Sequence, residues 1–185
     1  MRWRPAAWLL SAMLAAAGMA LGGVASPVRA AEYTLETAAT YNVRPVDHAI
    51  DVAVTMTFTY TTPDPDGQFS VFDDVRLAVH DGVTAATATD PDGDLDVSVD
   101  TTDGVNVATV KLRDSLRFED SIKLELHYRL ADRVNPRVRV GPSLVAFPAW
   151  GFGTASSVTV EIPAGFEVRV DGDPLTAGPG GLLQS

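Results

Sequence analysis

The sequence has 185 residues, no cysteine and a formal net charge of −10, from 24 acidic and 14 basic residues. This acidity argues against nucleic acid and anionic membrane surfaces as partners, and the absence of cysteine excludes disulfides and thiol nucleophiles. The hydrophobic fraction of 46% is ordinary for a folded domain and too high for a disordered chain.

Residues 1–30 have the three parts of a secretory signal peptide, which we expect to be helical. Arg2 and Arg4 form a positive start, an uncharged stretch rich in Ala and Leu follows, and Val28 and Ala30 place small residues where a signal peptidase would cut. We expect cleavage after Ala30 and a secreted, extracellular protein without membrane contact. A retained membrane anchor is the alternative, because the apolar stretch approaches the length that spans a bilayer.

Cleavage after Ala30 would remove three arginines and no acidic residue. The 14 basic residues would fall to 11 and the net charge to −13. A mature chain of about 155 residues can bury a sufficient core without disulfides.

Alternating side chains predict a first strand at residues 33–43, which Pro45 ends because proline fixes φ and has no backbone N–H. Residues 49–61 contain the most regular pattern of the chain. Between residues 50 and 60, large apolar side chains occupy every even position, and Asp, Ala or Thr every odd one. Successive side chains of a strand point to opposite faces, so we expect one apolar and one mostly polar face.

Shorter alternating runs follow, separated by turn residues such as Asp-Gly and Pro-Asp-Gly. They predict a third strand, a weak strand, another strand and a hairpin partner at residues 69–79, 83–89, 95–99 and 105–112. The apolar positions of the last run change parity between Val107 and Val110, which predicts a β-bulge.

The second strongest alternating pattern lies at residues 122–130. After it, residues 137–140 form a short basic stretch and residues 144–147 an apolar one, and alternating residues predict strands at 158–162 and 166–170. Strands at intervals of about ten residues, with turn residues between them and no helical period, are typical of an all-β domain.

We therefore predict an antiparallel β-sandwich, immunoglobulin-like or related, over residues 31–170. An up-and-down barrel is the alternative. Residues 171–185 are rich in Gly and Pro without an apolar pattern, which indicates a tail or a linker.

Closely spaced carboxylates around Gly93 form the one candidate metal site, at Asp90, Asp92, Asp94 and Asp96. Calcium takes hard oxygen ligands from such loops, but the spacing of an EF-hand is missing, and Asp and Gly favour turns for purely local reasons. Both interpretations stay open. We expect no other cofactor, because the 3 histidines are isolated in the sequence.

A loop with three aromatic side chains, Phe147, Trp150 and Phe152, is the most unusual local feature. It is either a platform for a protein or carbohydrate ligand, or a plug that closes the open end of the sandwich. Just before it, Arg137 and Arg139 alternate on one face and could meet acidic loops of a partner or of this domain.

We predict no catalytic residue, since the Gly-x-Ser-x-Gly motif is missing and no thiol is available. A hydrolase is the alternative. Its site would be assembled from distant residues, such as His48 or His127 with a Ser and an Asp.

Several segments resemble one known domain. They are Tyr-Thr-Leu at residues 33–35, the strand at 50–60, Ile-Lys-Leu-Glu-Leu-His-Tyr at 122–128 and Phe-Pro-Ala-Trp at 147–150. Together they resemble the β-rich N-terminal domain that precedes the catalytic domain in secreted M1-type (gluzincin) aminopeptidase-like proteins. The resemblance implies a supporting domain, with peptidase chemistry elsewhere. The His-Glu-x-x-His motif of that family is absent, so no catalytic residue is carried over.

We thus expect a secreted, non-catalytic module, an accessory or binding domain at the N-terminus of a larger exported protein. Two alternatives remain, a hydrolase and a calcium-dependent adhesion module.

Overall fold

The computed structural model describes residues 33–64, 70–153, 155–172, 176–177 and 182–184. Their regular structure is entirely β, which confirms the predicted fold class. No helix long and apolar enough to cross a membrane occurs in these ranges. The predicted signal peptide at residues 1–30 lies outside them.

The strands in chain order are β1 (Tyr33–Arg44), β2 (Ala49–Tyr60), β3 (Phe72–Val79), β4 (Ala86–Asp90), β5 (Gly93–Leu95), β6 (Val97–Thr102), β7 (Val105–Leu116), β8 (Ser121–Ala131), β9 (Arg139–Gly141), β10 (Leu144–Ala146), β11 (Ala155–Glu161), β12 (Thr176–Ala177) and β13 (Leu182–Gln184).

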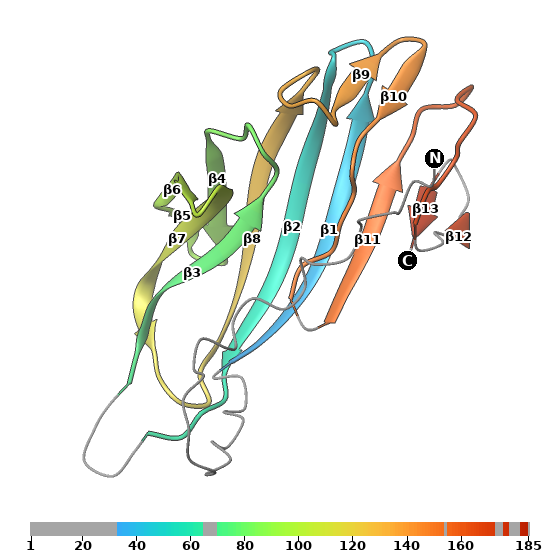
Figure 1. Cartoon of the computed structure of the whole chain (residues 1–185). Helices are drawn as coiled ribbons and strands as arrows, with labels where there is room; N and C mark the ends of the chain where they lie inside the picture. The colour runs from blue at the N-terminus through green and yellow to red at the C-terminus, as the bar shows by residue number, and fades with distance from the viewer. Residues whose placement is uncertain (1–32, 65–69, 154, 173–175, 178–181, 185) are drawn as a thin grey trace, which may run out of the picture.

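These strands form one large sheet, one small sheet and a hairpin (Figure 1). The large sheet has eight strands in the order β12-β13-β11-β1-β2-β8-β4-β5, the small sheet has the order β3-β7-β6, and β9 pairs with β10. The pairings are antiparallel except that of β1 with β11, which is parallel. The sandwich is therefore antiparallel with one parallel junction.

Strand β2 explains why the sheets pack as they do. Its six even-numbered side chains, from Ile50 to Tyr60, are each no more than 3% exposed, and its odd-numbered ones from Asp51 to Thr59 are half-buried. The register places Val54 between Ala39 of β1 and Leu126 of β8, so the apolar face continues across neighbouring strands. We call this the inner face of the large sheet.

The small sheet covers the inner face. Its strand β3 contributes Val75, Leu77 and Val79, and β7 contributes Ala108 and Val110; all five belong to the same buried cluster as β2. Burial of a Val or Leu side chain is worth roughly 1.5–3 kcal/mol. Two apolar faces thus form one core between the sheets.

At one end of this core, Phe72 of β3 packs against the large sheet. Its ring lies edge-on to Tyr60, Phe58 and Tyr33, with centroid distances of 4.9, 5.2 and 6.0 Å. Edge-to-face geometry is favourable for aromatic rings, so this cluster ties the start of β3 to β1 and β2.

The prediction of one continuous strand at residues 95–99 is wrong. Strand β5 pairs with β4 in the large sheet, whereas β6 pairs with β7 in the small sheet. The chain changes sheets at Asp96, whose carbonyl oxygen accepts a hydrogen bond from the Lys111 N–H at 2.9 Å. An alternating sequence pattern does not show such a change of layer, because the alternation continues through it.

The predicted bulge is also misplaced. Pairing of β7 with β3 is continuous from Asn106 to Lys111, and the irregularity lies between Lys111 and Leu116, opposite Phe72 and Asp74. Val107 is an apolar residue that faces away from the core, which explains the parity change without a bulge.

The strand predicted at residues 166–170 is absent from the described structure. Val168 and Val170 are 45% and 41% exposed. The free edge of β11 is instead taken by β13, which pairs Gln184 with Thr159. Two short strands thus lie within the Gly/Pro-rich segment 171–185, where the sequence showed no strand pattern.

An aspartate should have different effects on the two faces of β2. Val54→Asp places a charge at a side chain with 0% exposure, and we expect it to lower the free energy of unfolding by more than about 4 kcal/mol or to prevent folding. Urea unfolding followed by circular dichroism measures this change. Thr57→Asp is the matched control, because its outward side chain lies between Glu36 and Lys123. Native melting of Val54→Asp would contradict the assignment of the faces.

Candidate functional site

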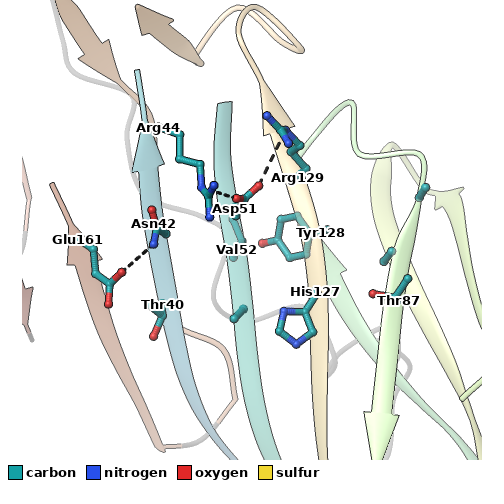
Figure 2. A pocket seen from close by; sticks show the side chains of 13 residues that line it. Thr40, Asn42, Arg44, Asp51, Val52, Thr87, His127, Tyr128, Arg129 and Glu161 are labelled. Atoms are coloured by element: carbon teal, nitrogen blue, oxygen red, sulfur yellow. Dashed lines mark hydrogen bonds and ion pairs between the residues drawn. The ribbon is translucent and has the colours of Figure 1, made fainter. Parts of the chain in front are cut away.

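A groove lies on the outer face of the large sheet, opposite the core. It has a volume of about 590 Å³ and crosses from β11 over β1, β2 and β8 to β4. Figure 2 shows the side chains that line it. Its volume is within the range of small-ligand sites, about 300–1,000 Å³.

Register explains why this part of the face is hollow. Thr40 of β1, Ala53 of β2, His127 of β8 and Thr87 of β4 are direct cross-strand neighbours and form one row. Three of the four side chains are short. The floor of the groove is therefore low, and His127 is the one large side chain on it.

The next row is charged. Glu161, Asn42, Asp51 and Arg129 are cross-strand neighbours on β11, β1, β2 and β8. The Asn42 amide donates to Glu161 Oε2 at 2.9 Å, and Arg129 Nε lies 3.8 Å from Asp51 Oδ1 (Figure 2). Arg44 Nε approaches the other oxygen of Asp51 to 2.7 Å. One carboxylate is thus shared by two guanidinium groups.

The ion pairs of Asp51 with Arg44 and Arg129 are weak enough to exchange partners. The Arg44, Asp51 and Arg129 side chains are 50%, 38% and 56% exposed. Ion pairs of such exposure contribute about 0–1 kcal/mol each. A ligand with its own charge could therefore exchange with a partner in this row.

The predicted hydrolase histidines lie apart from each other. His127 Nε2 lies 3.4 Å from Glu125 Oε1 on the outer face. His48 is in the β1–β2 turn, where its Nδ1 lies 3.1 Å from the Val140 carbonyl oxygen. The structure therefore brings one histidine to the groove, with a carboxylate beside it.

An arginine binds the first carboxylate of the candidate calcium site at residues 90–96. Arg113 donates to both carboxylate oxygens of Asp90, at 3.2 and 3.4 Å, and the Asp92 N–H also donates to this carboxylate. The hydrogen bond from Arg113 holds the pKa of Asp90 below its usual value. Asp92, Asp94 and Asp96 are exposed. Among the described residues no group of three or more His, Cys, Asp or Glu could hold a metal, and calcium binding stays a prediction.

The aromatic loop lies against the inner face of the large sheet. Phe147 packs against Tyr41 at 5.6 Å between ring centroids, and Trp150 contacts Phe152 edge-on at 6.4 Å. Phe152 is 7% exposed. This arrangement favours the interpretation in which the loop closes the sandwich over that of an open ligand platform.

Inner-face hydroxyls hold the backbone of this loop. The Tyr41 hydroxyl donates to the Trp150 carbonyl at 2.9 Å and accepts from the Trp150 N–H at 3.1 Å. Thr37 makes the same two contacts with Phe152. Gly153 has φ of +80°, and a Cβ there would collide with the Leu35 carbonyl oxygen. The loop thus passes too close to β1 for any other residue.

His80 is a buried residue to which the sequence assigned no role. It has 0% exposure and stacks on Trp150 with ring centroids 4.0 Å apart. Its Nε2 lies 2.8 Å from the Pro148 carbonyl oxygen, and its Nδ1 lies 2.9 Å from the Tyr128 hydroxyl. A carbonyl oxygen only accepts, so Nε2 carries the proton, and in the neutral ring Nδ1 accepts from Tyr128.

Burial keeps this network uncharged. It lowers the pKa of His80, raises the pKa of Tyr41 to about 12 and raises that of Tyr128 further. No sequence signal marks His80, because its partner Pro148 lies 68 residues later in the chain.

Comparisons with known proteins were made by sequence and by structure. No protein-family model matches the sequence, and no curated protein matches it. Native leukotriene A4 hydrolase from Saccharomyces cerevisiae is similar in structure, with a TM-score of 0.50 and 13% identity over 83% of this chain and 26% of that chain.

Two zinc peptidase structures are also similar. A two-domain M1 zinc metallopeptidase gives a TM-score of 0.43 at 14% identity, and the M1 zinc metallopeptidase from Deinococcus radiodurans gives 0.40 at 16%. Each match covers 82% of this chain and 38% of the other. The chain thus spans well under half the length of these proteins. The expected resemblance to an M1-type N-terminal domain is confirmed at the level of the fold.

His80 makes stability depend on pH. Its folded pKa is below the ordinary 6.5, so the unfolded state binds the proton more readily. Stability should be complete above pH 6.5 and fall as the pH drops from 6.5 towards the folded pKa, by up to about 1.4 kcal/mol per pH unit. Urea unfolding between neutral and mildly acidic pH measures this slope.

We expect His80→Gln to be less stable at neutral pH and to lose this part of the slope. His127→Gln, which removes an exposed histidine, is the control and should retain it. An equal slope in wild type and His80→Gln would contradict the role of His80.

Proposed function

We propose that this chain is a secreted, non-catalytic accessory domain of a larger exported protein, and that it binds its partner on the outer face of the large sheet. The fold likeness to yeast leukotriene A4 hydrolase supports this proposal, because the match covers 83% of this chain but only 26% of that enzyme. The signal-peptide pattern of residues 1–30 supports export.

The observation that carries the proposal is the organisation of the groove. Several of its polar side chains are paired across strands: Asp51 with Arg44 and Arg129, and Glu161 with the Asn42 amide. Three of the four side chains of its floor, Thr40, Thr87 and His127, are polar. Such a surface offers complementary charges and hydrogen bonds to a bound molecule.

A hydrolase is the second candidate, and one observation favours it. His127 lies on the groove floor with Glu125 at 3.4 Å, which is the base and orienting half of a catalytic triad. The nucleophile would have to be a neighbouring hydroxyl, and Thr87 is the direct cross-strand neighbour of His127. No hydrogen bond joins these two side chains in the described structure.

Activity measurements distinguish the two candidates. The exported protein, whose first residue should be Ala31 by mass spectrometry, is tested on aminoacyl arylamides and short acyl esters, with and without zinc. We expect no hydrolysis above background and the same result for His127→Ala. Turnover that disappears in His127→Ala would replace the accessory function with a hydrolase.

The coding sequence tests the part of the proposal that concerns a larger protein. We expect the reading frame to continue beyond Ser185 into a second domain. A His-Glu-x-x-His motif there would place zinc peptidase chemistry outside this domain. A stop codon directly after Ser185 would contradict the proposal of a larger protein. It would not affect the proposal that the outer face binds a partner.

A further inference from the structure

Three connections lie together at one end of the sandwich, at the top of Figure 1: the β1–β2 turn, the β8–β9 connection and the β9–β10 hairpin. We call this the turn end, formed by residues 44–48 and 129–146. Hydrogen bonds join its parts. The Asp132 N–H donates to the His48 carbonyl at 2.8 Å, and the Val140 N–H donates to Asp132 Oδ1 at 2.7 Å. The turn end is therefore ordered in advance of any contact.

The turn end carries the two most exposed large apolar side chains of the described residues. Val46, in the β1–β2 turn, is 84% exposed, and Leu144, at the start of β10, is 61% exposed. A single exposed apolar residue is ordinary. Two at one end of the domain, where hydrogen bonds join the connections, resemble the anchors of a protein interface.

Positive charge is also concentrated here. Five of the 11 basic residues outside the predicted signal peptide belong to the turn end: Arg44, Arg129, Arg133, Arg137 and Arg139. Aspartates pair with the first three, through Arg44–Asp47, Arg44–Asp51, Arg129–Asp51 and Arg133–Asp132.

Arg137 and Arg139 make no ion pair with any carboxylate that the structure describes. The Arg139 guanidinium donates to the carbonyl oxygens of Val138 and Asn135, at 2.8 and 3.4 Å. Arg137 is exposed, and its backbone N–H is held by the Asn135 side chain at 2.9 Å. The turn end thus has an excess of positive charge on a domain whose mature net charge would be −13.

We propose that the turn end is a docking surface for an acidic face of another protein domain. Val46 and Leu144 enter apolar contacts with the partner, and Arg137 pairs with a partner carboxylate. Interfaces enrich arginine and place it around apolar anchors. A pre-ordered surface also loses little conformational entropy on binding.

An anionic membrane is the other surface that would attract apolar tips and arginines. Segments that bind anionic lipid carry clusters of about 4–8 free basic residues. At the turn end aspartates pair with three of the five arginines. Residues 44–48 and 129–146 contain no Phe, Tyr or Trp. These observations favour a protein partner.

The proposal is tested with a fluorescein-labelled peptide of glutamate and leucine residues, followed by anisotropy at low ionic strength. We expect the mature protein to bind it and Arg137→Glu to bind about fivefold more weakly, the effect of reversing one exposed pair. Arg169→Glu is the matched control, since its side chain is 86% exposed and lies outside the turn end. It should bind as wild type does.

The apolar half of the proposal has its own variant. Val46→Ser with Leu144→Ser leaves the net charge unchanged and should weaken peptide binding by at least about fivefold, because each residue loses buried apolar area. Both sites are exposed, so an unchanged melting temperature shows that the variant is folded.

Three results would overturn the proposal. They are failure of the wild-type protein to bind the peptide, equal losses in Arg137→Glu and Arg169→Glu, and binding to vesicles of phosphatidylcholine and phosphatidylserine without binding to the peptide. The last result would assign the turn end to a membrane.

Discussion

Removal of the inner face of the large sheet from water is the constraint on which the rest of this structure depends. The even-numbered side chains of β2 and their neighbours on β1 and β8 form an apolar surface too wide for one covering element. The small sheet covers one part of it through β3 and β7. The aromatic loop at residues 147–153 covers another part, and Phe72 closes the remaining end.

The aromatic loop has no strand partner for its backbone, and this explains the polar residues of the core. Buried backbone N–H and C=O groups must find partners. Thr37 and Tyr41 supply them from β1, and His80 supplies one from the end of β3. Every buried side-chain nitrogen and oxygen that the structure describes has a hydrogen-bond partner. The network of His80, Tyr128 and Tyr41 is thus a consequence of covering a sheet with an irregular segment.

The sequence predicts what is local and periodic. Strands β1, β2 and β8 were found within one or two residues of their ends, because alternation over many residues has one structural explanation. The change of sheet at Asp96 and the pairing of β13 with β11 depend on distant partners, so alternation could not reveal them. The same limit applies to the groove. Glu161, Asn42, Asp51 and Arg129 become one row only through the register of four strands.

The difference between the two faces also indicates where function can reside. Each inner-face side chain is fixed by its neighbours, and a change of one methylene there is felt by the core. The exposed side chains of the outer face and of the turn end carry no such restriction. There, Asp51 pairs with two arginines, and Arg137 pairs with no carboxylate that the structure describes. Val46 is exposed to water although it is apolar. The packing of the core does not determine these three features. We therefore expect this domain to contact other molecules through the outer face and the turn end.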